Sequence, residues 1–239
     1  MTFRELFIDI FTKNGLEFYI REDVMEKFER LTEIMVAKNQ VMNVTALTTH
    51  EKIIPLHYAD CVKMAALIPE GATVIDIGCG GGFPILPLAI VRPDLRITGL
   101  DSTDKKIRYV QETADALGLD VSTISGRAED IAKMARHRDG YDVVISRAVA
   151  RLNVLDELCL PFAKVGGVLL AMKGSAGQEE AQEAENGIKK LGGRIKSMEE
   201  YELFTCEETE KRWLIRISKE SATPKEFPRA FGAMKKKPL

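Results

Sequence analysis

The pattern of hydrophobic and polar positions changes near residue 70. Before this point, four apolar residues recur at the spacing of one helical face: Val24, Phe28, Leu31 and Met35. A second helix is predicted over residues 50–67, after a polar turn. From residue 72 onward, short β-branched runs alternate with longer helical segments, a pattern typical of a parallel sheet covered by helices on both faces. We therefore expect an N-terminal helical extension over residues 1–70 and an α/β domain over 71–239.

Five short apolar runs predict the parallel strands: Thr73–Ile77, Arg96–Leu100, Val121–Ile124, Asp142–Ile145 and Val168–Met172. The predicted helices between and after them cover residues 84–92, 103–117, 128–136, 152–163 and 177–191. Two more strands, Arg194–Phe204 and Trp213–Ser218, follow with no helix between them. They predict an antiparallel pair at the edge of a mostly parallel, seven-stranded sheet. The tail after Ser221 contains three prolines and three consecutive lysines, so we expect it to be irregular.

Composition narrows the class of protein. The 239 residues are 45% hydrophobic and 29% charged, which suits one well-packed domain with an extension. No stretch approaches the roughly 18 consecutive apolar residues of a membrane span, and the first residues do not resemble a signal peptide. The four cysteines form no CxxC pair, and the three histidines fall in no metal-binding motif. We therefore expect a cytoplasmic protein with reduced thiols, no membrane partner and no metal site.

The charge is unevenly distributed along the chain. The net charge is -2, but residues 211–239 carry +7 and the rest of the chain carries -9. A basic end suits a phosphate-bearing partner such as a nucleic acid, because local patches decide such binding. A solvated tail has the same charge pattern, so both interpretations stay open on charge alone.

A glycine-rich turn follows the first predicted strand. It reads Asp76-Ile77-Gly78-Cys79-Gly80-Gly81-Gly82-Phe83-Pro84. Glycines such as Gly78 and Gly80 let the backbone approach a ligand closely. Phe83 stands where the dinucleotide fingerprint GxGxxG needs a glycine, and the Asp76 carboxylate suits a cationic, phosphate-free ligand such as S-adenosylmethionine (SAM). The pattern resembles motif I of the class I SAM-dependent methyltransferases, which implies their Rossmann-like α/β fold.

The ends of the second and third strands carry further acidic residues. Asp101 is placed to accept hydrogen bonds from ribose hydroxyls, although it also suits the cap of a helix that begins at Thr103. After the third strand, methyltransferases of this class contact the adenine with backbone amides and an acidic side chain. Ala128 and Glu129 occupy that place, and Glu129 also suits the first turn of a helix.

The loop after the fourth strand favours an acceptor that needs no deprotonation. It contains Arg147 but lacks the [DN]-P-P-[YF] sequence of amine methyltransferases, a Pro-Cys nucleophile and an Asp/His pair. Guanine N7 carries an exposed lone pair and no proton, so its methylation requires alignment and not a general base. Arg147 suits this role by bonding the cofactor carboxylate, guanine O6 or a phosphate. A surface arginine after a strand fits the same position.

With these residues in place, the chain resembles the RsmG (GidB) family from about residue 19 to the C-terminus. The matching elements are Met42–Ala46, Pro55–Asp60, Asp76–Pro84, Leu100–Lys106, Arg127–Glu129, Ser146–Ala148, Met172–Gly174, Phe227–Arg229 and Lys237–Leu239. Phe83-Pro84 is more specific than the glycines, because most class I enzymes lack it. Leu56, Cys61 and Cys79 depart from the family's usual residues, and residues 230–235 replace its usual glycine-containing segment.

The resemblance implies a function and a set of site residues. Members of the family transfer a methyl group from SAM to N7 of a guanine in small-subunit (16S) ribosomal RNA, so the implied partner is that RNA or the small ribosomal subunit. Residues implied to contact SAM are Gly78, Phe83, Ala128, Glu129 and Arg147, the last also as catalytic residue. Residues implied to line the acceptor side are Arg127, Lys173, Arg212 and Arg229. The N-terminal helices fit an accessory role or ordinary packing.

Three other functions fit parts of the sequence. A SAM-dependent methyltransferase acting on a small molecule or protein would be active without RNA. An RNA-binding assembly factor without catalysis is disfavoured by the intact glycine-rich turn and Asp101. An NAD-dependent oxidoreductase is disfavoured by Phe83 and by the lack of a hydride-transfer acid or base.

Overall fold

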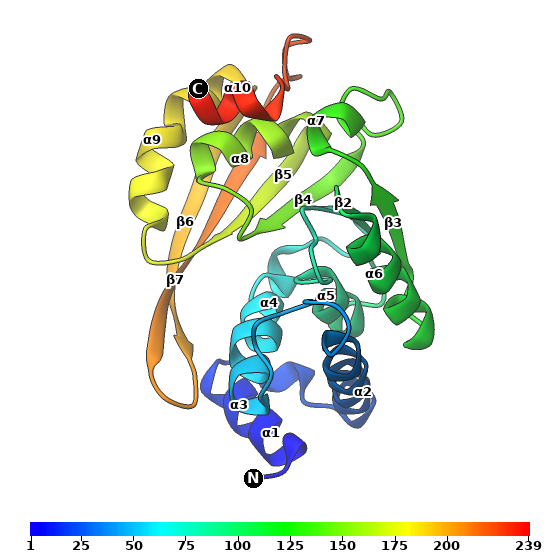
Figure 1. Cartoon of the computed structure of the whole chain (residues 1–239). Helices are drawn as coiled ribbons and strands as arrows, with labels where there is room; N and C mark the ends of the chain where they lie inside the picture. The colour runs from blue at the N-terminus through cyan, green and yellow to red at the C-terminus, as the bar shows by residue number, and fades with distance from the viewer.

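The computed structural model describes residues 1–239 and contains one sheet with the strand order β3-β2-β1-β4-β5-β7-β6 (Figure 1). The strands are β1 Thr73–Ile77, β2 Arg96–Asp101, β3 Val121–Ser125, β4 Tyr141–Arg147, β5 Ala163–Lys173, β6 Gly193–Phe204 and β7 Thr209–Lys219. β7 runs antiparallel to β5 and β6, and the other neighbouring strands pair in parallel. The predicted mostly parallel, seven-stranded sheet is confirmed.

Ten α-helices accompany the sheet: α1 Phe3–Lys13, α2 Glu22–Asn39, α3 His50–Ile53, α4 Asp60–Val62, α5 Ile85–Val91, α6 Asp104–Ala116, α7 Ala128–Ile131, α8 Leu152–Cys159, α9 Gly177–Lys190 and α10 Phe231–Lys236. Helices α1 to α6 lie on one face of the sheet, and α7 to α10 lie on the other (Figure 1). None of the helices combines the length and the hydrophobicity that a membrane-spanning helix requires. All four cysteines are free thiols.

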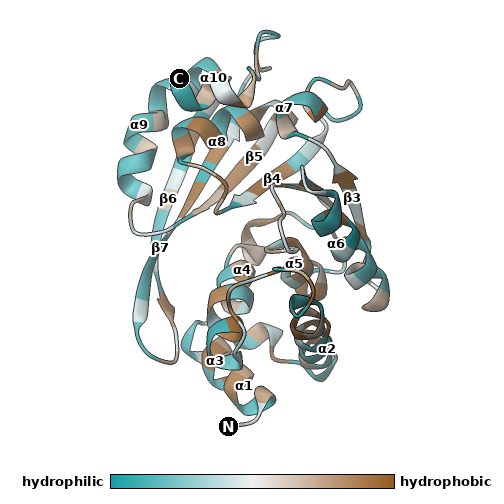
Figure 2. Ribbon diagram, in the orientation of Figure 1, coloured by the Kyte–Doolittle hydropathy of each residue, from teal (hydrophilic) through white to brown (hydrophobic).

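A hydrophobic core lies on each face of the sheet. The first contains 46 buried residues and joins the N-terminal helices to α5, α6 and the strands. Helix α5 is buried along its whole length, because it lies between the sheet and the N-terminal helices. The second core contains 25 buried residues and packs α8 to α10 on the opposite face, where α8 is coloured mostly hydrophobic and α9 mostly hydrophilic (Figure 2). A division of the chain at residue 70 into separate units stays a prediction.

Two predicted helices are interrupted by proline. The helix expected over 50–67 is instead α3, a π-helical segment over Ile54–Ala59, α4, and a 3-10 turn over Ala65–Leu67. Pro55 lacks the amide hydrogen that would bond the preceding turn, and its ring disfavours a regular α-helix. The helix expected over 152–163 ends at Cys159, where a 3-10 turn containing Pro161 leads into β5.

Two other expectations about local structure were wrong. The helix expected over 128–136 ends at Ile131, because residues 133–136 are all exposed and give no apolar face to pack. The tail after Ser221, expected to be irregular, contains α10. This short helix forms because Met234 is fully buried in the second core.

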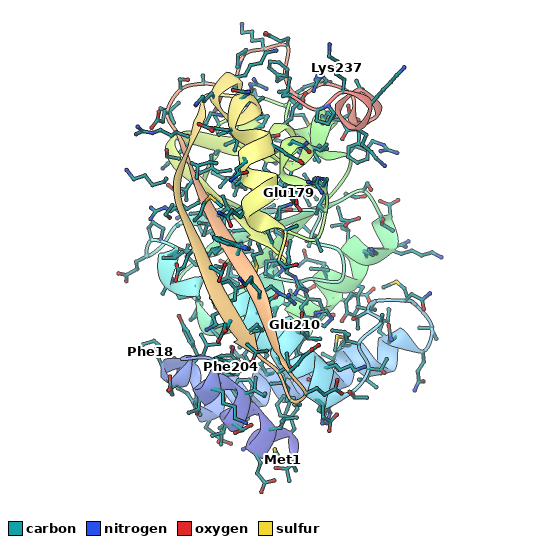
Figure 3. All side chains as sticks on the ribbon, turned by 90° about the vertical axis from the view of Figure 1, so that its left-hand side faces the viewer. Met1, Phe18, Glu179, Phe204, Glu210 and Lys237 are labelled. Carbon is teal, nitrogen blue, oxygen red and sulfur yellow. The ribbon has the colours of Figure 1, made fainter.

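The long hairpin of β6 and β7 connects the two ends of the molecule. Figure 3 shows it running from the side of α9 toward the N-terminal helices, with Phe204 near its far end. There the buried Asn14, at the end of α1, accepts a hydrogen bond from the backbone amide of Phe204 at 3.1 Å and donates to its carbonyl at 2.9 Å. The hairpin is therefore fixed to the extension as well as to the sheet.

Candidate active site

A first cavity of about 420 Å³ opens at the carboxyl ends of β1 to β4. Its wall contains most residues that the sequence predicted for cofactor binding: Gly78, Gly80, Phe83, Asp101, Ala128, Glu129 and Arg147. Arg127, which was expected on the acceptor side, lines the same cavity. β1 lies between β2 and β4, so the connections on its two sides diverge and leave a crevice at this edge of the sheet.

The glycine-rich turn packs closely against its surroundings. Gly78 has a φ of +79°, and a Cβ atom there would lie 2.5 Å from Cγ2 of Val149. The amide of Gly80 donates to Oδ2 of Asp101 at 3.0 Å, and Oδ1 of Asp101 accepts from the amide of Thr103 at 2.8 Å. Asp101 therefore fixes the turn and the start of the segment that leads into α6, while its side chain still lines the cavity.

Glu129 offers the first cavity an unpaired carboxylate. The residue is 8% exposed and makes no hydrogen bond or ion pair through its carboxylate within the chain. It lies in the first turn of α7, which follows Arg127 directly. Because buried polar atoms are normally paired, a carboxylate that faces a cavity in this way is available to a ligand.

Asp76 does not line either large cavity. It is fully buried in β1, and neither carboxylate oxygen has a hydrogen-bond partner. Burial raises the pKa of this carboxyl well above its ordinary value, and the nearby charge of Arg147 only partly opposes that effect. Direct contact of Asp76 with a cofactor stays a prediction.

A second cavity of about 660 Å³ adjoins the first. The two share four wall residues: His57, Arg147, Ala148 and Val149. The predicted acceptor-side residues Lys173 and Arg212 line only this second cavity. Arg147, at the end of β4, thus stands on the boundary between a cavity with the predicted cofactor residues and a cavity with predicted acceptor residues.

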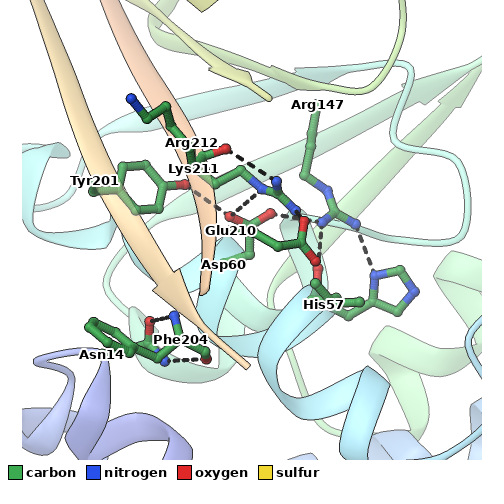
Figure 4. A network of polar contacts seen from close by, with 10 residues as sticks. Asn14, His57, Asp60, Arg147, Tyr201, Phe204, Glu210, Lys211 and Arg212 are labelled. Atoms are coloured by element: carbon green, nitrogen blue, oxygen red, sulfur yellow. Dashed lines mark hydrogen bonds and ion pairs between the residues drawn. The ribbon is translucent and has the colours of Figure 1, made fainter. Parts of the chain in front are cut away.

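Arg147 is held rigidly by the N-terminal extension. Its side chain is 17% exposed, and Nη1 donates to the Leu56 carbonyl at 2.8 Å and lies 3.2 Å from Oδ2 of Asp60 (Figure 4). Nη2 lies 3.0 Å from Nδ1 of His57. Leu56 and His57 belong to the π-helical segment that contains Pro55, and Asp60 begins α4 directly after it. The stretch from Leu56 to Asp60 therefore brings a carbonyl, a ring nitrogen and a carboxylate to one guanidinium.

His57 is fixed in one neutral tautomer by its neighbours. An arginine can only donate, so Nδ1 of His57 accepts from Arg147 and the proton lies on Nε2, which donates to Oγ1 of Thr45 at 2.7 Å. The imidazole stacks on Phe83 with ring centres 4.1 Å apart and an interplanar angle of 11°. Burial, followed by the charge of Arg147, lowers the pKa of His57 to about 3.

Asp60 lies between two arginines. It is 4% exposed, and its Oδ1 accepts from the Tyr201 hydroxyl at 2.9 Å and lies 3.7 Å from Nε of Arg212 (Figure 4). Tyr201 and Arg212 are opposite one another across β6 and β7. Arg212 also pairs with Oε2 of Glu210 at 2.6 Å. A chain of ion pairs of alternating charge therefore links Arg147, Asp60, Arg212 and Glu210 in the second cavity.

The remaining two predicted RNA residues have partners inside the protein. Lys173, only 7% exposed at its side chain, donates to the Ala150 carbonyl and pairs with Glu180 at 2.9 Å, so it braces the loop after β4. Arg229 does not reach either cavity. Its guanidinium pairs with the buried carboxylate of Glu157 at 2.6 Å and attaches the C-terminal tail to α8. An RNA contact of either residue stays a prediction.

Several residues of the site were not singled out by sequence reasoning. Asp60, Tyr201 and Glu210 were not proposed as site residues, and His57 was considered equally suited to a structural role. The spacing of His57 and Asp60 was a usable signal, because residues three apart share a helical face. Tyr201 and Glu210 lie about 140 residues or more from Asp60 in the chain, and no local pattern predicts that they meet.

Comparison with known proteins identifies the family. The family described as rRNA small subunit methyltransferase G (GidB) matches residues 24–207. A ribosomal RNA small subunit methyltransferase G from Brevibacillus brevis is 39% identical over 239 residues, covering 99% of each chain. One of the same name from Clostridium perfringens is 41% identical over 228 residues, covering 94% of each. The chain belongs to the GidB family.

Solved structures agree with the fold. The chain is similar to TYW2 from M. jannaschii, solved in complex with AdoMet, with a TM-score of 0.54 and 17% identity over 67% of this chain and 74% of that one. It is also similar to YcgJ from Bacillus, with a TM-score of 0.54 and 14% identity over 70% of this chain and all of that one. The class I methyltransferase fold is therefore confirmed, as is the prediction of a SAM-dependent methyltransferase at the level of the family.

The first cavity fits SAM. Its volume of about 420 Å³ is in the range of small-molecule sites, and the turn at Gly78 leaves no room for a side chain. Asp101 and the unpaired Glu129 line it with carboxylates that would suit hydroxyl and amino groups, and Arg147 with a cation that would suit a carboxylate. No group of three or more His, Cys, Asp or Glu side chains is arranged to hold a metal ion.

We predict that Gly78→Ala weakens SAM binding at least about tenfold, because the added methyl forces the turn away from Val149 and strains a positive φ. Isothermal titration with SAM measures the effect. Gly232→Ala is the matched control, since Gly232 has open space around it and no positive φ. Wild-type affinity in Gly78→Ala would contradict the proposed role of the turn.

We predict that His57 makes the protein less stable in acid. The pKa of His57 in the folded protein is about 3, below its ordinary value of 6.5. Between these two pH values the unfolded chain therefore binds a proton that the folded protein does not bind. The contribution of the neutral ring is fully present above pH 6.5 and is lost as the pH falls toward 3. Between pH 7 and pH 4 the free energy of unfolding should fall by up to about 3 kcal/mol from this residue.

Urea unfolding of wild type and His57→Asn across that pH range tests this expectation. The asparagine does not titrate but keeps an oxygen near Arg147, so its stability should depend less on pH. His50→Asn, at an exposed histidine, should follow the wild type. Parallel curves for wild type and His57→Asn would show that His57 is not protonated on unfolding.

Proposed function

We propose that the protein transfers a methyl group from SAM to N7 of a guanine in small-subunit (16S) ribosomal RNA. The observation that carries the proposal is the boundary between the two cavities. The two titratable groups that contact Arg147 there, His57 and Asp60, both accept from arginine, and this disfavours either of them as a general base. A site of this kind suits an acceptor that reacts through an exposed lone pair. Guanine N7 is such an acceptor.

Methyl transfer to N7 requires that the methyl group of SAM be aligned with the N7 lone pair and that the positive charge on the base be stabilised. SAM supplies an electrophilic methyl group on a sulfonium, and the sulfur keeps the S–C electron pair when the methyl group leaves. The lone pair of guanine N7 forms the new bond, and the positive charge passes to the base without any proton transfer. Arg147 is proposed to orient both reactants, because it faces both cavities and is fixed by three partners.

The substrate assignment rests on the relatives and on charge. The curated relatives named above are ribosomal RNA small subunit methyltransferases and match this chain over nearly its full length. Basic residues lie beside the cavities, with Lys106 and Arg127 at the first and Arg212 at the second. Three exposed lysines, Lys235–Lys237, follow Phe231, which itself lines the first cavity. We propose RNA or the small subunit as partner and the cytoplasm as the place of action.

Labelled methyl transfer tests this function. The protein is incubated with methyl-labelled SAM and small ribosomal subunits from cells that lack their own enzyme, and the labelled nucleoside is identified after digestion. We expect 7-methylguanosine at one site. Arg147→Gln should lower the single-turnover rate at least about 100-fold, because it removes a fixed charge at the reacting atoms. Arg30→Gln, which removes an exposed arginine of α2, should leave the rate unchanged.

Two other outcomes would contradict the proposal. Label in another nucleoside would reject guanine N7 as acceptor. SAM binding without any label in RNA would favour the alternative, a methyltransferase that acts on a small molecule or a protein.

A further inference from the structure

Of the three carboxylates in the second cavity, Glu210 is the most exposed and has an oxygen without a partner. Both carboxylate oxygens of Asp60 have partners: Oδ1 contacts Tyr201 and Arg212, and Oδ2 contacts Arg147. Glu180 is 14% exposed at its side chain, and its Oε2 accepts from both Lys173 and the first amide of α8. Glu210 uses Oε2 to pair with Arg212, while Oε1 has no partner and the side chain is 30% exposed.

The charged groups that line this cavity complement the polar groups of guanine. N7 and O6 are acceptors on one edge of the base, and N1–H and the 2-amino group are donors on the next. Arg147 lies at the boundary with the first cavity, and a chain of ion pairs leads from it through Asp60 and Arg212 to Glu210 (Figure 4). With N7 toward the first cavity, O6 faces arginine and the two donors face Glu210.

We propose that Glu210 is a specificity-determining residue whose carboxylate accepts hydrogen bonds from N1–H and the 2-amino group of the acceptor guanine. This inference rests on the proposed function and adds how the base is selected. Adenine has an N1 lone pair in place of the N1–H and no 2-amino group, so it would turn an acceptor toward the carboxylate. Arg212 is the positioning residue, because its ion pair holds Oε2 and leaves Oε1 to the base.

The same contact assists the reaction. Methyl transfer places a positive charge on the guanine ring, which makes N1–H and the amino group more acidic. Their hydrogen bonds to a carboxylate therefore strengthen in the transition state. An interaction that strengthens in this way raises kcat as well as affinity. Glu210 is thus expected to act on both KM and kcat.

The test compares the methylation rates of guanosine and inosine, which lacks only the 2-amino group. Each nucleoside is placed at the acceptor position by ligating the small-subunit RNA from segments, and the RNA is then assembled into subunits. Wild type should methylate guanosine about tenfold faster than inosine, because a hydrogen bond to a charged group is lost. In Glu210→Gln, Arg212 holds the amide oxygen and turns the NH₂ toward the donors of the base. The rate on guanosine should fall at least tenfold, and the guanosine/inosine ratio should approach one. SAM affinity should be unchanged.

Glu200→Gln is the matched control, since Glu200 pairs with Lys211 on the same hairpin but lines neither cavity. It should keep the wild-type rate and ratio. The ratio is measured within one variant and is therefore independent of the fraction of folded protein. An unchanged ratio in Glu210→Gln, with wild type active, would reject this inference alone. Failure of wild type to methylate guanosine would reject the proposed function and the inference together.

Discussion

A buried carboxylate between two arginines is the interaction on which the site depends. Asp60 is 4% exposed, and it contacts Arg147 from β4 and Arg212 from β7. Without Asp60, two partly buried cations would lose the carboxylate that lies between them, which costs several kcal/mol. The pairing therefore fixes the end of β4 relative to the long hairpin. It also sets the boundary between the two cavities.

The N-terminal extension is part of this site. Its helices share one hydrophobic core with the sheet, and the stretch that follows Pro55 contributes three partners to Arg147. The loop before it also closes the glycine-rich turn, because a Cβ at Gly81 would lie 2.8 Å from Cγ1 of Val44. The extension therefore does more than cover the sheet. It shapes the first cavity and orients the arginine that borders the second.

Most of the fold could be predicted from local patterns. The strand at Thr73–Ile77 and the turn at Asp76–Pro84 carry periodicity and motif signals that require no knowledge of distant contacts. The network around Asp60 could not be predicted in this way, because its members come from opposite ends of the chain. Asp76 and Arg229 show a second limit of prediction from sequence. Their residue types suit ligand binding, but burial and the Glu157 ion pair decide where each side chain points.

A double-mutant cycle on Asp60→Asn and Arg147→Gln tests the central claim most directly, with single-turnover methylation of small subunits at saturating SAM as the measurement. If Asp60 acts by holding Arg147, each single variant is slow and the double variant is about as slow as Arg147→Gln alone. Rate losses that multiply in the double variant would show that Asp60 acts independently of Arg147, and would contradict the account.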